Sequence, residues 1–391
     1  VAWSDMSTGS FQVQGVEFES ILTTIERLNP AEILFPETQT AIVDCLKGLL
    51  YAFPLPKDSF ESSNSEKNIK KFFGDFAHQT DFSRAQFSAI NGILNYLSQT
   101  QISEKPFLLP PVLIDKKRIL EIDPATRRSL EITTTLSGEK KGCLLNTIDK
   151  TKTAIGARLL ANRIASPLAV KPEIEERLDL VSWFLSQNII KTEIGELLKG
   201  LPDFERSLTR LSVGRGGPRD LFSLATAIEK VKQISGLIEK AVSLSSPKLL
   251  ADISRVTSNP YALSIKIKDA LAENLPLLAR EGQFIRAGFD TQLDSLRDLR
   301  DESRGHIASL QREYSASTGI SSLKVKHNNV VGYHIEVRSN HAKKLMSEEH
   351  FIHRQTTAQA ARFTTTALGE LERKLATAAN RAIAIEVSLF D

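Results

Sequence analysis

The sequence predicts a multidomain protein with an N-terminal α/β part, a mainly α-helical middle part, and two long antiparallel helices that carry a small antiparallel β unit. Three observations predict this. Strand and helix patterns alternate over the first hundred residues, and helical patterns then dominate to about residue 289. Finally, two stretches with apolar residues every 3.5 positions flank a segment of about fifty residues in which apolar and polar residues alternate. A chain of 391 residues is also too long for one simple core.

Residues 1–104 are expected to form the α/β part. The expected elements are strands at 1–5, 11–13 and 32–35, and helices at 17–28, 38–50 and 85–100. Such an order predicts a layered unit with at least one crossover connection. The polar, serine-rich segment 59–68 predicts a loop.

Residues 105–289 are expected to form the helical part. Pro172 and Pro218 stand where helical patterns begin, the position at which a missing N–H costs least. Four arginines could form ion pairs within this part or face a partner, and both interpretations stay open: Arg206, Arg210, Arg215 and Arg219. The glycine-rich segment 214–217 predicts a tight interhelix loop, and 138–143 does not have the GxxxxGK[ST] spacing of an ATPase phosphate loop.

Residues 290–315 and 368–391 are expected to be the two long helices, here called the arms. The outgoing seam is Phe289, Leu293, Leu296, Arg300, Ser303, Ile307, Leu310 and Tyr314, and the returning seam is Leu368, Leu371, Leu375, Ala378, Ala382, Ile385 and Leu389. Seams of this period predict antiparallel packing, with each arm spanning roughly 35 Å at about 1.5 Å per residue. The leucines alone would favour an ordinary buried helical hairpin, and it is the composition of the segment between the arms that favours a tip held away from the body.

Residues 316–367, here called the tip, are expected to be β-rich. Leu323–Lys326 alternates apolar and basic residues, Asn328–Asn329 has turn chemistry, and 331–338 alternates again, which predicts a hairpin. In that second strand Val331, Tyr333, Ile335 and Val337 would face the core, and Gly332, His334, Glu336 and Arg338 would face solvent.

The tip concentrates positive charge. Its seven lysines and arginines against three glutamates give +4, more than the +3 of the whole chain. Cations with short polar side chains suit a phosphate backbone. The expected DNA-backbone contacts are Lys324, Lys326, Arg338, Lys343, Lys344 and Arg354, followed by Asn340, His341 and Gln355. Five of the seven histidines also lie here, without the ligand spacing that would predict a zinc site.

Several strings in the tip, in one order, resemble the bacterial MutS family of DNA mismatch repair proteins. They are Thr318-Gly319-Ile320, Leu323-Lys324-Val325, Asn329-Val330-Val331-Gly332-Tyr333-His334-Ile335, Arg354-Gln355-Thr356 and Arg362-Phe363. Asp5–Gly9 is similar to the opening hairpin of the family's RNase H-like connector, and 119–131 to the opening of its core. The resemblance covers nearly all of the chain and only the middle of the family's architecture.

The resemblance implies a fragment: connector at 1–104, core at 105–289, levers at 290–315 and 368–391, and clamp at 316–367. It implies a clamp that binds duplex backbone without reading sequence, and levers coupled to an ATPase domain beyond residue 391. A mismatch-reading domain would precede residue 1. For the full-length protein it implies ATP and Mg²⁺, a homodimer on double-stranded DNA, a MutL-type partner and the bacterial cytosol. For residues 1–391 it implies no cofactor, no metal and no catalysis.

Three alternatives stay open. One is a structural module whose arms bind a protein partner, and another is a MutS-like paralogue acting in recombination. The third is a nuclease on the α/β part with Asp5 as a first metal ligand, for which Glu37 and Asp44 are poor second ligands. Two distant cysteines fit a reducing cytosol, and the apolar runs are too short to predict a membrane span.

Overall fold

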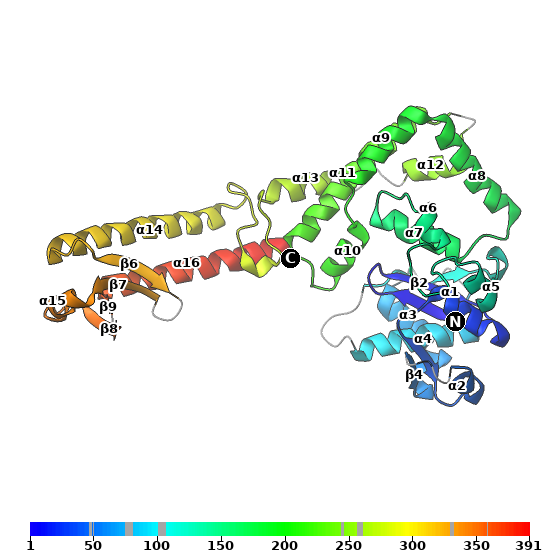
Figure 1. The fold of residues 1–391 in the computed structure, drawn as a ribbon, viewed down its shortest axis with the longest axis horizontal. Helices are drawn as coiled ribbons and strands as arrows, with labels where there is room; N and C mark the ends of the chain where they lie inside the picture. Colours follow the sequence, from blue (N-terminus) through cyan, green and yellow to red (C-terminus); the bar gives the residue numbers. More distant parts are fainter. Residues whose placement is uncertain are drawn as a thin grey trace. The chain divides into compact units, whose positions relative to one another are not determined.

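The computed structural model describes residues 1–46, 49, 51–74, 81–100, 107–243, 246–255, 261–328, 332–357 and 359–391, without the side chains of 64–66, 252, 254–255, 300–301 and 303–304. The chain forms two compact units, 1–267 and 268–391 (Figure 1). Several expectations lie outside the described residues, among them the turn position Asn329, the strand position Val331, the end of the helix expected at 38–50, and the seam side chains Arg300 and Ser303.

The first unit begins with a sheet that joins distant parts of the chain. Strands β1 (Ala2–Asp5) and β2 (Ser10–Gln14) form the expected hairpin, and β2 also pairs in parallel with β5 (Val112–Ile114). Phe11 and Val13 of β2 are buried against helix α4 (Arg84–Thr100), which is confirmed almost to the residue. The crossover is therefore confirmed, and it connects strands about a hundred residues apart.

A second, two-stranded parallel sheet pairs β3 (Ile33–Pro36) with β4 (Ala52–Leu55). Its small core contains Ile25 from α1 (Ile21–Leu28) and Leu46 from α2 (Thr40–Leu46). Helix α1 follows a short 3₁₀ turn, η1 (Phe18–Ser20), and ends where Asn29 takes a left-handed conformation. The expected helices are present, whereas β4 was missed because its four residues include a proline.

The loop expected at 59–68 is wrong. This segment contains the 3₁₀ turns η2 (Lys57–Phe60) and η3 (Ser62–Asn64) and the start of α3 (Ser65–Phe73). Asparagines of α4 hold it in place, because the amides of Asn91 and Asn95 donate to the carbonyls of Glu61 and Ser59, each at 2.8 Å. The backbone of this segment is therefore anchored to the surface of a helix.

The rest of the first unit is mainly helical, as expected. It begins with the 3₁₀ turn η5 (Lys116–Arg118). The helices that follow are α5 (Pro124–Ser129), α6 (Leu144–Ile148), α7 (Ala154–Ala165), α8 (Lys171–Ser186), α9 (Asn188–Lys199), α10 (Phe204–Ser212), α11 (Pro218–Ala241) and α12 (Lys248–Arg255). Helix α13 (Tyr261–Ala270) contains the boundary between the units. Asp123 and Thr153 cap the N-termini of α5 and α7 through their side-chain oxygens.

The second unit consists of the two arms and the tip. After the 3₁₀ turn η6 (Ala279–Glu281), α14 (Thr291–Thr318) runs out and α16 (Thr366–Phe390) returns beside it, with the tip sheet between them in sequence (Figure 1). Asp290 and Thr365 cap the two arms. By residue count, α14 is about 42 Å long and α16 about 37 Å.

The tip forms a four-stranded antiparallel sheet in the order β6-β7-β9-β8. Its elements are β6 (Lys324–Asn328), β7 (Gly332–Arg338), η7 (Ser339–His341), α15 (Ala342–Met346), β8 (Ile352–Thr356) and β9 (Ala360–Thr364). The expected hairpin is β6–β7. Strands β8 and β9 and helix α15 complete the fold, with β6 and β8 at the edges.

The seam between the arms is confirmed at buried positions from base to tip and is wrong at its outermost basal positions. Leu293, Ile307 and Tyr314 are buried on α14, as are Leu368, Leu375 and Ala378 on α16. Phe289 and Leu389 are instead about 40% exposed, and Glu386 is buried. The chain from Gly282 to Ile285 packs against α16 there, so that the Glu386 carboxylate, which the predicted seam did not include, takes an inward position.

Candidate nucleic-acid interface

One face of the tip sheet is apolar and is covered by the arms. Ile335 and Val337 of β7 and Phe363 of β9 pack with Ile307 of α14 and Leu375 of α16 in one buried cluster. Alternation along a strand then sends the neighbouring residues to the other face. The core of the tip therefore determines which side chains the sheet presents to solvent.

Side chains of both arms also hydrogen-bond to the sheet. The amide of Val325 in β6 donates to Gln311 Oε1 of α14 at 2.8 Å, and the amide of Tyr333 in β7 donates to Glu372 Oε1 of α16 at 3.1 Å. The hydroxyls of Tyr314 and Thr365 lie 2.7 Å apart in the interior. Each arm is therefore hydrogen-bonded to a different strand, which fixes the orientation of the sheet on the arms.

The polar face contains a row of facing charges that crosses the sheet. Lys324 and Arg362 are the cross-strand partners of Glu336, and Gln355 is that of Arg362. Lys326, two residues from Lys324 and on the same face, places Nζ 2.6 Å from Glu336 Oε1. Arg362 places Nε 3.5 Å from Glu336 Oε2 and donates through Nη1 to Gln355 Oε1 at 2.8 Å. The hydrogen bond from Lys326, and secondarily that from Arg362, lowers the pKa of Glu336 despite its partial burial.

Most of the expected DNA contacts are exposed at the tip. Lys324, Arg338, Lys343, Lys344, Asn340, Arg354 and Gln355 are exposed, and His341 is half-buried. Among the described residues, the five cations in that set have no ion pair. Arg354 lies at an irregularity in the pairing of β8 with β9, between His353 and Gln355. Lys326 differs from this set because Glu336 already neutralises it.

Two residues of the polar face differ from expectation. His334 was expected to face solvent and is 1% exposed, with Nδ1 2.9 Å from the carbonyl of Gly332. Its Nε2 lies 3.9 Å from Glu336 Oε2 and has no hydrogen-bond partner within the described part of the chain. Arg362 was counted among the tip cations without being expected to contact DNA, yet it stands in the centre of the charged row. The sequence feature that could have identified Arg362 is its position between Ala361 and Phe363. Both neighbours are fully buried, so alternation along the strand sends the side chain of Arg362 to the opposite face.

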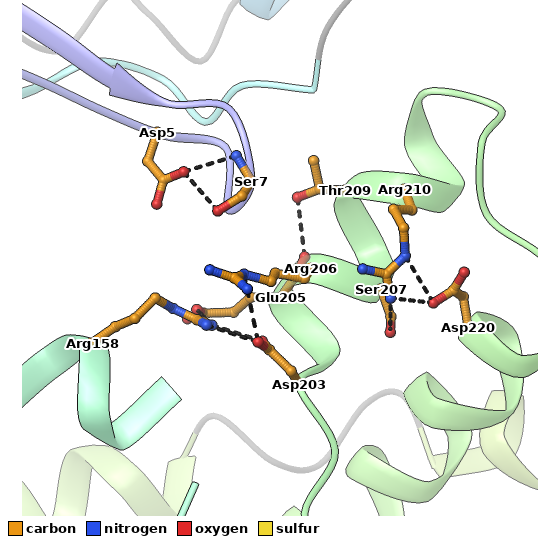
Figure 2. Close-up of polar contacts among 10 residues, drawn as sticks. All are labelled: Asp5, Ser7, Arg158, Asp203, Glu205, Arg206, Ser207, Thr209, Arg210 and Asp220. Carbon is orange, nitrogen blue, oxygen red and sulfur yellow. Dashed lines mark hydrogen bonds and ion pairs between the residues drawn. The ribbon is translucent and has the colours of Figure 1, made fainter. Parts of the chain in front are cut away.

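In the first unit, the arginines of α10 form internal ion pairs (Figure 2). Arg210 pairs with Asp220, whose carboxylate also accepts from the amide of Gly217 at 3.1 Å, and Arg206 lies 3.7 Å from Asp203. Arg158 of α7 binds both oxygens of Asp203 at 2.7 Å. Its guanidinium also reaches Glu205 at 2.8 Å. Arg206 and Arg210 therefore form ion pairs within the helical part, which was one of the two interpretations left open.

Asp5, the candidate first ligand of a nuclease, is engaged in a turn. Its carboxylate accepts from the amide of Ser7 at 2.8 Å and from the hydroxyl of Ser7 at 2.7 Å (Figure 2). Burial acts to raise the pKa of Asp5, but the hydrogen bonds from Ser7 outweigh it and the pKa is lowered. Among the described residues, no group of three or more His, Cys, Asp or Glu side chains is placed to hold a metal ion. Within that same part of the chain, no helix is both long and apolar enough to cross a membrane.

Comparison with known proteins identifies two regions. A family profile described as MutS domain II matches residues 1–109, and one described as MutS domain III matches residues 125–382. The chain is also 39% identical over 401 aligned positions to the DNA mismatch repair protein MutS of Nitrobacter winogradskyi. That alignment includes the whole of this chain and 45% of the relative, so the chain spans less than half of the relative's length. The chain therefore belongs to the MutS family.

Proposed function

We propose that this chain supplies the middle part of a DNA mismatch repair protein of the bacterial cytosol. In this proposal the tip is a clamp that binds the phosphate backbone of duplex DNA without reading its sequence. The arms are levers that couple the clamp to an ATPase domain outside residues 1–391. Connector and core would be residues 1–104 and 105–289.

The observation that carries the proposal is the exposure at the tip of five cations that form no ion pair with any residue that the structure describes. Lys324, Arg338 and Arg354 project from strands, and Lys343 and Lys344 project from helix α15. The apolar core beneath fixes the backbone of these elements. Phosphate contacts of this kind dominate affinity for DNA and carry no sequence information. Asn340, His341 and Gln355 would add neutral hydrogen bonds beside them.

The hydrogen bonds between arms and sheet support the coupling role. Because Gln311 and Glu372 hold different strands, a relative movement of the two arms would reorient the tip sheet. A loosely attached tip would not respond in this way. We infer that nucleotide-dependent movement of the arms changes the grip of the tip on DNA.

The named relative favours repair over the alternatives of a recombination paralogue or a protein-interaction module, since it is itself a mismatch repair protein. By the same argument, the full-length protein would use ATP and Mg²⁺, act as a homodimer on duplex DNA, and work with a MutL-type partner. These roles would involve domains beyond the residues described here.

The test is a salt titration of duplex binding. The variant carries Lys324→Gln, Lys343→Gln, Lys344→Gln and Arg354→Gln, and binding to a mixed-sequence duplex is followed by fluorescence anisotropy. Each lost phosphate contact lowers the slope of log K against log salt by about 0.9, so the slope falls by about three to four units. The loss should be the same on duplexes of different sequence.

The matched control removes four exposed lysines of the helical part: Lys140, Lys141, Lys150 and Lys152, each changed to Gln. Its total charge changes equally, so it should keep nearly the full slope if the tip is the binding site. Equal slopes for the tip variant and the unmodified chain would contradict the proposal.

A further inference from the structure

Glu336 is an anion placed in the middle of a surface proposed to bind an anion. Its carboxylate is 21% exposed and faces Lys326 on one oxygen and Arg362 on the other. Burial of Ile335 and Val337 on either side holds its strand, β7, which lies inside the sheet. The position of the carboxylate is therefore determined by the core of the tip.

Arg362 is held in one orientation by two acceptors. Nε points to Glu336, and Nη1 donates to Gln355 Oε1. Its side chain is 25% exposed, and among the described residues nothing accepts from Nη2. Because a guanidinium has five N–H donors in a planar fork, the remaining donors stay available for an incoming oxyanion.

We propose that Glu336 acts as an internal stand-in for a DNA phosphate. Without DNA it positions Lys326 and Arg362 and neutralises part of their charge. When the tip meets a duplex, a backbone phosphate takes over these two cations, which makes Arg362 a further DNA-contacting residue. The inference rests on the proposed function and deepens it, by naming a residue that weakens the grip of the tip on any duplex.

The exchange is feasible because the internal contacts are weak. Ion pairs at a partly exposed surface contribute little to stability, so little is lost when Lys326 turns to another anion. Lys326 lies on the edge strand β6 and is 51% exposed, so its flexible stem can move while Glu336 stays in place. The carboxylate then remains beside the bound phosphate, and this repulsion keeps the contact readily reversible.

The test changes Glu336→Gln in the full chain and compares it with Glu349→Gln. Glu349 is exposed in the same tip and has no ion pair among the described residues. Each change removes one negative charge, so the net charge rises by one in both variants. Duplex binding is titrated against salt with a mixed-sequence duplex. Glu336→Gln should bind roughly threefold to tenfold tighter at about 50 mM salt, with a slope steeper by about one to two units, since two cations become available. Glu349→Gln should leave the slope nearly unchanged.

A second variant tests whether Arg362 is responsible for part of the steeper slope. Adding Arg362→Gln to Glu336→Gln should remove about one unit of the gained slope. Thermal melts check that every variant is folded, so that a loss of the added slope cannot be attributed to unfolding. Equal slopes for Glu336→Gln and Glu349→Gln, or weaker binding by Glu336→Gln, would overturn the inference while leaving the proposed function intact. Failure of the four-cation tip variant to change the slope would instead overturn both.

Discussion

The base and the tip of the arms each hold a glutamate against an arginine, and they differ in burial. At the base, Glu386 is 3% exposed, receives Arg297 Nη2 at 2.5 Å and accepts from the amide of Phe284 at 3.4 Å. At the tip, Glu336 faces two cations that remain partly in solvent. Arg297 also donates to the carbonyl of Ile285, so the basal pair ties a loop to both arms. A glutamate–arginine ion pair thus stabilises the structure where it is buried, here called the basal clasp (Glu386 with Arg297), and is an exchangeable contact where it is exposed.

The largest effect should follow from breaking the basal clasp. Glu386→Ala leaves Arg297 without its carboxylate and the Phe284 amide without its acceptor. Removing one partner of a buried pair costs about 3–5 kcal/mol, and the low end applies because Arg297 keeps 18% exposure. Urea unfolding of the chain measures the loss. Glu370→Ala on the exposed side of the same helix should change stability by less than about 0.5 kcal/mol, and equal losses would contradict the comparison.

A glycine at the tip should give the next largest effect. Gly332 has φ +73°, and a Cβ added there would overlap the Glu372 carboxylate that accepts from Tyr333. Gly332→Ala should therefore destabilise the tip by about 1–3 kcal/mol. Gly369 lies on α16, the arm that carries Glu372. A Cβ added at Gly369 meets nothing within 4 Å, so Gly369→Ala should stabilise the helix by up to about 1 kcal/mol. If both substitutions change the free energy of unfolding in the same direction, this explanation is refuted.

The contact between the outgoing arm and β6 should have a smaller effect. Gln311→Ala leaves the amide of Val325 without its acceptor, at a cost of about 1 kcal/mol. Amide hydrogen exchange at Val325 should quicken by about fivefold to tenfold, while Ile335 inside the sheet should be unchanged. Glu313→Ala, exposed on the same helix, is the matched control. If Val325 exchanges equally in both variants, Gln311 does not hold the strand.

The smallest effect should be the acid dependence of the tip pair. Lys326 and Arg362 lower the pKa of Glu336 from its ordinary value of 4.5, so the carboxylate contributes stability above that value and loses it as pH falls through the lowered pKa. The contribution is below about 1 kcal/mol because the pair is partly exposed. Urea unfolding from neutral pH into this acidic range should show a shallower fall for Glu336→Gln than for the unmodified chain. Parallel pH profiles would mean that the pair contributes nothing.

Much of the fold follows from local patterns in the sequence. The 3.5-residue period of Leu368, Leu371 and Leu375 predicts the returning arm, and the alternation at 323–326 and 331–338 predicts the first hairpin of the tip. The parallel pairing of β2 with β5 was not predicted, because a partner a hundred residues away leaves no local signal. The 3₁₀ turns and helix at 57–73 were missed because asparagines of α4, which only the folded structure brings near, bind the backbone carbonyls of Ser59 and Glu61.

The site was less predictable than the fold. Composition alone indicated which cations gather at the tip, since charged side chains such as Lys343 and Arg354 avoid burial. It did not indicate that Lys326 is already paired, because that depends on the register of β6 against β7. Nor did it predict a buried Glu386, since the partners that make its burial tolerable, Arg297 and the Phe284 amide, are about ninety to a hundred residues away.

Hydrogen exchange of the whole chain with and without a mixed-sequence duplex tests the central claim most directly. Binding through the exposed cations should slow exchange in β6, in β8 and in the turn and helix that follow β7. The slowing should weaken as salt is raised. Protection that appears elsewhere and spares these tip segments, or no change in exchange anywhere when duplex is added, would contradict the account.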